Sequence, residues 1–251
     1  FKGKCRYWLT FNEINCGMMS LGNYMSLGIL NPGSFDLRHQ KDNPQKRLQA
    51  LHHQFVASAL AVKAGHEIDP DNKMGCMIAY MLAYPLTPNP ADVELARERN
   101  QYRNYYCSDV QVRGEYPYFA QRIWDEEGVT LDITDEDRKI LKEGTVDFYT
   151  HSYYQSQCAS TDPAEETSGN LLAAPRIPIL KRLRGSGQST PWVFVSCSTR
   201  CTSAIKSPLW WLRTASAAAM RSTRMDPSTM TIVSSTCVTT SSYGRGHQGW
   251  R

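Results

Sequence analysis

The sequence has no long hydrophobic run, no paired cysteine motif and almost no acidic residue in its last third. No apolar stretch approaches the roughly eighteen residues that a membrane-spanning helix requires, so we expect a soluble chain without a membrane partner. The eight cysteines lack the paired spacings of metal sites, which predicts reduced thiols in a cytoplasmic protein. Because the first residue is Phe1 and not Met, we expect the native N-terminus to lie further upstream.

Acidic residues are distributed unevenly and divide the chain near Ala174. From Pro175 onward, 11 Lys and Arg residues accompany a single acid, Asp226, whereas residues 1–174 contain 17 bases and 23 acids. Residues 1–174 have the composition of an ordinary folded domain. Residues 175–251 are rich in Ser and Thr and show no persistent apolar period, which predicts a disordered basic tail.

Strand-like and helix-like segments alternate along residues 1–174. Aromatic, β-branched or continuously apolar runs predict strands over residues 7–12, 73–82 and 146–154. Cap residues followed by proline, or a capping box, mark the helix starts, at Asn43–Pro44, Asn89–Pro90 and Thr134 with Asp137. The predicted helices span residues 44–65, 91–103 and 135–143, with Gly65 and Gly144 as stops. This alternation predicts an α/β fold with a parallel sheet.

Three polar side chains fall at the carboxyl ends of the predicted strands, where parallel α/β folds gather functional groups. Glu13 follows the first strand, and Tyr153 and Tyr154 end the third. A partly desolvated carboxylate in such a place can serve as a proton donor. The alternative is a structural Glu13 that caps a neighbouring helix or pairs with an Arg.

Four stretches resemble glycoside hydrolase family 1, in its bacterial 6-phospho-β-glucosidase branch. They are "TFNEIN", "LHHQFVASALAVKAGHEIDPDNKMGCMIAY", "NYYCSDVQVRGEYP" and "EGTVDFYTHSYYQS", in the order the family has them. The resemblance runs from Phe1 to about Ala173. It implies part of a (β/α)8 TIM barrel, strands four to six with their helices, and retaining hydrolysis of a 6-phosphorylated β-glucoside without a metal or organic cofactor.

The resemblance also implies roles for individual residues. Glu13 matches the general acid/base, and Asn12 matches the residue that binds the sugar 2-hydroxyl. Tyr154 matches the hydroxyl that orients the nucleophilic carboxylate. Ser152 replaces the Asn of ordinary β-glucosidases, which is typical of the phospho-sugar branch. The family has apolar residues where His151 and Gln155 stand beside "SYY". We expect this difference to affect local packing more than the chemistry.

Two further polar groups have structural interpretations. His52 and His53 are adjacent, so on a helix they point about 100° apart and are poorly placed to chelate one metal. His52 lies on the apolar stripe and is expected to be a packed, hydrogen-bonded histidine. The acidic run "DEDRK", residues 135–139, is expected to be the solvated start of a helix.

The nucleophile that the family requires is missing. A retaining mechanism needs a second carboxylate about 5 Å from the first, and no Glu-Asn-Gly motif follows Tyr154. Tryptophan has a single codon, so Trp210 and Trp211 fix the bases TGGTGG. If reading starts two bases into this stretch, permitted codons for the next four residues allow the sequence Val-Val-Glu-Asn-Gly. We therefore expect a frameshift near residues 173–174 that makes residues 175–251 non-native. From the resemblance we also expect the first three barrel strands, with the family's His-Trp site, to be absent from this sequence, because Phe1 stands just before strand four.

Several functions remain open from the sequence. The first is a 6-phospho-β-glucosidase fragment, inactive as it stands and poorly soluble because its sheet edges are open. A β-glucosidase or a 6-phospho-β-galactosidase of the same family is an alternative. A non-catalytic sugar-binding remnant and a nucleic-acid binder that uses the basic tail are the others, although no nucleic-acid partner is expected because the tail lacks regularly interleaved aromatics.

Overall fold

The computed structural model of the chain describes residues 1–30, 41–163, 210–213, 230–233 and 236–240. Its strands are β1 (Tyr7–Leu9), β2 (Lys73–Pro85), β3 (Phe148–Ala159), β4 (Trp210–Arg213), β5 (Met230–Val233) and β6 (Thr236–Thr240). Its helices are the 3₁₀ turn η1 (Ile14–Met18), α1 (Gly22–Met25), α2 (Pro44–Ile68), α3 (Pro90–Asn100), the π-helical η3 (Gln101–Tyr105), α4 (Tyr106–Arg113), α5 (Ala120–Glu127) and α6 (Asp135–Glu143).

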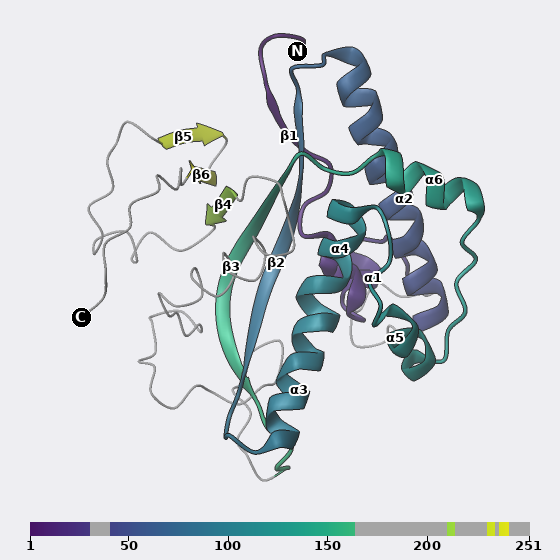
Figure 1. The fold of residues 1–251 in the computed structure, drawn as a ribbon, viewed down its shortest axis with the longest axis vertical. Helices are drawn as coiled ribbons and strands as arrows, with labels where there is room; N and C mark the ends of the chain where they lie inside the picture. Colours follow the sequence, from purple (N-terminus) through teal and green to yellow (C-terminus); the bar gives the residue numbers. More distant parts are fainter. Residues whose placement is uncertain (31–40, 164–209, 214–229, 234–235, 241–251) are drawn as a thin grey trace.

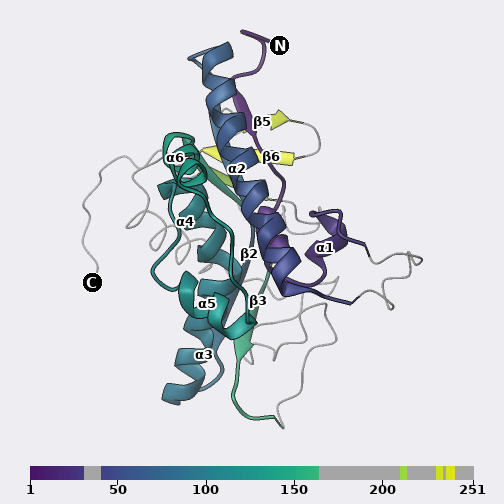
Figure 2. The same ribbon diagram turned by 90° about the vertical axis from the view of Figure 1, so that its right-hand side faces the viewer.

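The first three strands form a parallel sheet in the order β1-β2-β3, as the alternation of elements predicts. Figure 1 shows the larger helices gathered on one side of this sheet. Figure 2, viewed from that side, shows α2 beside the rod formed by α3 and α4, with β2 and β3 behind them. The arrangement is the layered β/α architecture that a parallel sheet requires for its crossovers.

The core lies between β2 and the helices. Alternate side chains of β2 join the main apolar cluster, whereas the intervening ones on the opposite face are also buried. The apolar stripe of α2 contributes to the same cluster through Leu48, Leu51, Phe55, Ala59 and Val62. Burial on both faces explains the continuous apolar run that marked β2 in the sequence.

The helix caps predicted from the sequence are present. The Asn43 side chain accepts a hydrogen bond from Lys46 N at 3.0 Å, with Pro44 at the first helical position. Thr134 and Asp137 form a reciprocal capping box at the start of α6. The acidic run that follows Thr134 is largely solvated, as expected. These local hydrogen bonds satisfy N–H groups that have no partner within the helix itself.

Several elements differ from the predictions, among them β2 and β3, which end later than expected, at Pro85 and Ala159. Gly65 does not end α2, which continues to Ile68; a Cβ at Gly65 would lie 2.5 Å from the Met74 sulfur, so the glycine serves close packing. The strand predicted over residues 7–12 pairs only over β1. The helix predicted to end near Arg103 continues through η3 and α4 to Arg113, and α5 was not predicted.

The C-terminal strands were also not predicted. β4, β6 and β5 form a separate antiparallel sheet within residues 210–240, where the composition predicts disorder. Their Trp, Val, Ile and Thr residues have high β-propensity, which explains strand formation without a clear alternating pattern. The remainder of residues 175–251 lies outside the described ranges, so the predicted tail is otherwise untested.

Candidate functional site

Glu13 stands in the turn that follows β1. The strand ends at Leu9, and Thr10 makes one more ladder-like bond, donating its N–H to the Gly75 carbonyl at 3.3 Å. The chain then bends, and Glu13 immediately precedes η1. Its side chain is half-buried, whereas Asn12 is exposed. The carboxylate is therefore carried by a loop at the carboxyl end of a parallel strand, where functional groups of such sheets gather.

The backbone of Glu13 is strained. Its φ of 47° and ψ of 48° lie in the left-handed region, and no other non-glycine residue in the described ranges has a positive φ. Such a conformation persists only where the surroundings impose it, and it occurs often at functional sites. The Glu13 side chain makes no capping hydrogen bond to η1, which argues against the structural alternative of a helix cap.

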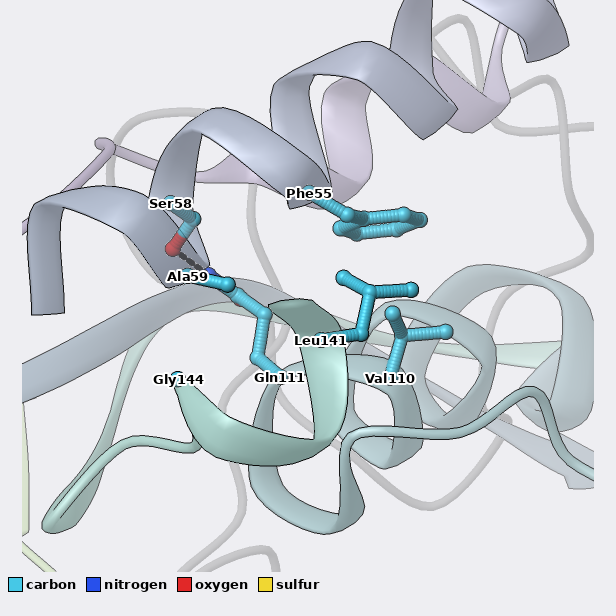
Figure 3. Close-up of a pocket in the computed structure, with 7 residues that line it drawn as sticks. All are labelled: Phe55, Ser58, Ala59, Val110, Gln111, Leu141 and Gly144. Carbon is cyan, nitrogen blue, oxygen red and sulfur yellow. Dashed lines mark hydrogen bonds between the residues drawn. The ribbon is translucent and has the colours of Figure 1, made fainter. Parts of the chain in front are cut away.

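A buried polar chain fixes the backbone before Glu13. The Thr10 hydroxyl lies 2.7 Å from the Ser58 hydroxyl on α2, and Gln111 Nε2 on α4 donates to Ser58 Oγ at 3.0 Å. Figure 3 shows the Ser58–Gln111 contact at the junction of three helices. The backbone carbonyl of Gln111 in turn accepts the Val146 N–H at 3.1 Å, just before β3. The approach to Glu13 is thereby tied to both neighbouring helices.

An asparagine fixes the backbone after Glu13. Asn15 is fully buried, and its amide makes three hydrogen bonds. Oδ1 accepts the Ala79 N–H at 2.8 Å, while Nδ2 donates to the carbonyls of Ala79 at 2.8 Å and Arg103 at 2.7 Å. β1 no longer pairs with β2 at this level, and the Asn15 amide takes the place of a neighbouring strand. It thereby satisfies buried backbone groups of β2 that would otherwise lack partners.

Two more asparagines continue this pattern along β2. Asn104 pairs with the N–H and carbonyl of Met81, and Asn100 pairs with those of Ala83, over distances of 2.8 to 3.2 Å. We refer to Asn15, Asn104 and Asn100 as the asparagine ladder. Because Ala79, Met81 and Ala83 alternate along one strand, their backbone groups point to the same edge. The ladder therefore closes the edge of β2 beyond Thr10.

The end of η1 has a third attachment. The Met18 carbonyl accepts hydrogen bonds from Tyr102 Oη at 2.6 Å and from the buried Arg47 guanidinium. Arg47 is also paired with Asp42 at 3.0 Å and Glu127 at 3.3 Å. Burial raises the pKa of Tyr102 above its ordinary value, so its hydroxyl stays protonated and able to donate.

The π-helical segment η3 supplies two of these contacts. Tyr102 and the Arg103 carbonyl both belong to it, and its wider turn is shown by the Tyr106 N–H, which bonds to the carbonyl of Gln101 five residues earlier. π-helical turns are rare and are frequent at functional sites. Here the segment faces η1 and holds it at both Asn15 and Met18.

Tyr154 lies on β3 at an irregularity of the sheet. Tyr80 pairs with Tyr153 and Met81 pairs with Gln155, so Tyr154 is the extra residue of a β-bulge. Ala79, to which Asn15 binds, is adjacent to Tyr80 in β2. The Glu13 loop, through Asn15, and the Tyr154 bulge therefore meet β2 at neighbouring residues from its two sides. Bulges often re-aim a side chain beside an active site.

The histidines behave as structural groups. His52 is buried, its Nδ1 lies 2.8 Å from the Tyr116 hydroxyl and its Nε2 lies 3.4 Å from Asp137 Oδ2. Burial lowers its pKa, with Asp137 opposing the shift. The prediction of a packed, hydrogen-bonded His52 is confirmed. Within the described residues, no group of three His, Cys, Asp or Glu side chains has a metal-binding arrangement.

The cavity drawn in Figure 3 is not a substrate site. Its lining residues come from α2, α4, α6 and the glycine that follows α6, and they are Phe55, Ser58, Ala59, Val110, Gln111, Leu141 and Gly144. The space leaves no room for a water molecule. It is a small packing gap behind the Thr10–Ser58–Gln111 chain, so it has no direct part in chemistry.

Sequence reasoning proposed Glu13, Asn12 and Tyr154 as site residues but missed the residues that hold the Glu13 loop. The asparagine ladder and the Thr10–Ser58–Gln111 chain join segments 17 to 88 residues apart in sequence. The spacing of four between Asn100 and Asn104 places both on one helix face, which is the only local signal of the ladder. Their common target on β2 appears only in three dimensions.

Comparison with known proteins gives consistent matches. The sequence profile of glycosyl hydrolase family 1 matches residues 1–199, which is further than the limit at Ala173 expected from the motifs. The chain is 42% identical over 193 residues to the aryl-phospho-beta-D-glucosidase BglH of Bacillus subtilis (strain 168), and equally to the 6-phospho-beta-glucosidase of Clostridium longisporum. Each match covers 76% of this chain and 39% of the relative. The chain thus spans well under half of these relatives.

Solved structures show the same fold. The psychrophilic beta-glucosidase BglU from Micrococcus antarcticus superposes with a TM-score of 0.63 at 22% identity, covering 82% of this chain and 46% of that one. A beta-glucosidase from Exiguobacterium marinum gives a TM-score of 0.60 at 20% identity, with 81% and 44% covered. The described β/α segment is part of a (β/α)8 barrel, as the sequence resemblance implies. Among the described residues, no helix combines the length and the apolar character that a membrane span requires.

Proposed function

Because the chain belongs to glycosyl hydrolase family 1, we propose that it is the central segment of an enzyme that hydrolyses 6-phosphorylated β-glucosides with retention of configuration. The observation that carries the proposal is the loop of Glu13, which three separate attachments hold in a strained conformation beside the part of β2 that the Tyr154 bulge meets from its other side. Relatives named as phospho-β-glucosidases support the substrate class.

In this proposal Glu13 is the general acid/base. It protonates the glycosidic oxygen as the aglycone leaves, and in the second half of the reaction it removes a proton from the attacking water. Asn12 binds the sugar 2-hydroxyl, a contact that strengthens at the transition state. Tyr154 orients the nucleophilic carboxylate. The chemistry needs two carboxylates and no metal or organic cofactor.

The nucleophile is proposed to be lost through a change of reading frame, which the motifs place near residues 173–174. Because the family profile matches as far as residue 199, we propose that the change occurs before Trp210 at the latest. The shifted reading that restores Val-Val-Glu-Asn-Gly uses the codons that begin at Trp210. On this basis residues after the change are non-native, and the 251-residue chain cannot form the covalent glycosyl intermediate. Sequencing the gene tests this directly, because codons incompatible with the shifted reading would exclude it.

The activity is tested in two steps with a chromogenic 6-phospho-β-glucoside. The 251-residue chain is expected to release no aglycone. The same segment, in a gene product with the frame restored and the flanking barrel strands present, is expected to release it. Glu13→Gln in that product should lower the rate by about 10²- to 10⁴-fold, as loss of general acid–base catalysis does.

Matched substrates separate the alternatives. The unphosphorylated glucoside and the 6-phospho-β-galactoside are assayed beside the 6-phospho-β-glucoside. Preference for either would assign the enzyme to another branch of the family. Turnover by the 251-residue chain itself would contradict the loss of the nucleophile, and an undiminished Glu13→Gln rate would contradict the role of Glu13.

A further inference from the structure

We propose that Asn15 is a positioning residue for Glu13. The hydrogen bonds of the Asn15 amide to the Ala79 backbone and to the Arg103 carbonyl, here called the clamp, set the position of the Glu13 carboxylate. The inference rests on the proposed function only for the role of Glu13 as the general acid/base. The geometry comes from the buried amide and the strained turn, which lie two residues apart.

Asparagine fits this position by its hydrogen-bonding inventory. One oxygen accepts the Ala79 N–H, and the two amide hydrogens are used by two different carbonyls, so every polar group of the fully buried side chain has a partner. Asp offers no donor when ionised and at most one when protonated, so it cannot serve both carbonyls, and Ala offers neither donor nor acceptor. The clamp thus joins η1 to β2 and η3 through one side chain.

The clamp is transmitted to Glu13 through a single short turn. The Cys16 N–H bonds to the Glu13 carbonyl at 2.9 Å, so Asn15 lies inside the hydrogen-bonded turn that begins at Glu13. Because Glu13 holds a positive φ, the turn has a more relaxed alternative to which it can return when it is released. Loss of the clamp should therefore move Glu13 more than it disturbs distant parts of the core.

Cys16 provides a reporter that needs no catalysis. Burial and the nearby Glu13 charge raise the pKa of the Cys16 thiol to about 11. Since only the thiolate reacts with an alkylating agent, the rate of Cys16 alkylation depends on the proximity of Glu13. Peptide mass spectrometry separates Cys16 from the other seven cysteines of the chain.

The experiment is a double-mutant cycle on the 251-residue chain with iodoacetamide, followed over a range of alkaline pH. In the unmodified background, Glu13→Gln should speed Cys16 alkylation about threefold, because a neighbouring negative charge is removed. In the Asn15→Ala background, the same Glu13→Gln change should have no further effect, since the carboxylate has already left its place. The coupling between the two substitutions is the quantity that a merely structural role for Asn15 would not produce.

Asn100→Ala is the matched control. Asn100 makes the same two-bond contact with β2, at Ala83, and belongs to the same ladder but lies further from Glu13. The Glu13→Gln effect should survive in that background. Asn15→Leu, which keeps a similar volume, adds no charge beside Cys16 and loses the acceptor and both donors, carries the same comparison if Asn15→Ala does not fold by circular dichroism.

An undiminished Glu13→Gln effect in the Asn15 variants would overturn the proposal. So would equal loss of the effect in Asn100→Ala, because it would show general loosening of the sheet edge. The readout is independent of hydrolysis. A failed hydrolase assay with intact coupling would therefore refute the proposed function and leave the positioning role in place. Hydrolysis without coupling would support the proposed function and refute the positioning role.

Discussion

At the scale of single residues, His151 shows how burial sets a charge state. It is fully buried on β3, with its ring centroid 5.4 Å from that of Tyr80 and 6.2 Å from that of Tyr149. Burial lowers its pKa to about 4. The family resemblance leads one to expect an apolar residue here, and a neutral imidazole between aromatic rings meets nearly the same packing requirement.

The low pKa of His151 predicts a loss of stability in acid. The unfolded chain binds this proton near pH 6.5 and the folded chain near pH 4, so the free energy of unfolding should fall as the pH drops through that window. The loss attributable to His151 is at most about 3 kcal/mol. Urea denaturation across the window measures it.

His151→Phe separates this contribution from those of other groups. The variant should show a shallower fall between pH 6.5 and 4, because the titrating group is absent and the ring is retained. His52, whose pKa is also lowered by burial, will leave part of the slope. A His151→Phe curve parallel to that of the unchanged chain would contradict the prediction.

At the scale of elements, two glycines bring neighbouring elements close together by different means. A Cβ on Gly144, after α6, would lie 2.4 Å from the carbonyl oxygen of Ala59 on α2, so backbone meets backbone. Figure 3 shows Ala59 on α2 and Gly144 after α6, both at the helix junction. At Gly65, a Cβ would instead meet the flexible side chain of Met74. The first contact can be relieved only by moving a helix.

Gly144→Ala should therefore destabilise the protein more than Gly65→Ala. Overpacking against rigid backbone is expected to cost about 1 to 3 kcal/mol or somewhat more. At Gly65 the gain of about 1 kcal/mol in helix propensity offsets part of the displacement of Met74. Urea midpoints of the two variants, compared with that of the unchanged chain, give the order. A larger loss at Gly65 would show that Met74 cannot adapt.

At the scale of the whole molecule, the partial barrel leaves an open sheet edge. No described strand pairs with the side of β1 that faces away from β2. Leu9 on β1 is 40% exposed, and Tyr7 beside it is similarly exposed. An unpaired apolar edge can pair with another copy of the chain. The sequence-based expectation of poor solubility has this physical basis.

Leu9→Lys is expected to reduce self-association of the chain. A lysine on an edge strand opposes edge-to-edge pairing through charge repulsion and solvation. Sedimentation velocity over a concentration series should show a smaller oligomeric fraction. Leu60→Lys is the control, because Leu60 is 47% exposed on the helix α2 and not on a strand, and the change adds the same charge. Equal improvement by both variants would assign the effect to net charge.

Local signals in the sequence determined the parallel strands, the caps of α2, α3 and α6 and the position of Glu13 after β1. Each depends on a few neighbouring residues, such as Asn43 before Pro44 or Thr134 with Asp137, so a linear reading is enough. The family resemblance added the barrel and the roles proposed for Glu13, Asn12 and Tyr154. It did not indicate which hydrogen bonds hold the Glu13 loop in place.

Tertiary structure alone decided how the Glu13 loop is held. The Asn15 amide meets Ala79 and Arg103, 64 and 88 residues away along the chain, and Thr10 meets Ser58 on α2. It also decided that Gly65 packs against Met74 and does not end its helix. These outcomes depend on which surfaces the folded chain brings together. A buried polar group takes whatever partner lies within reach, and sequence order does not record that distance.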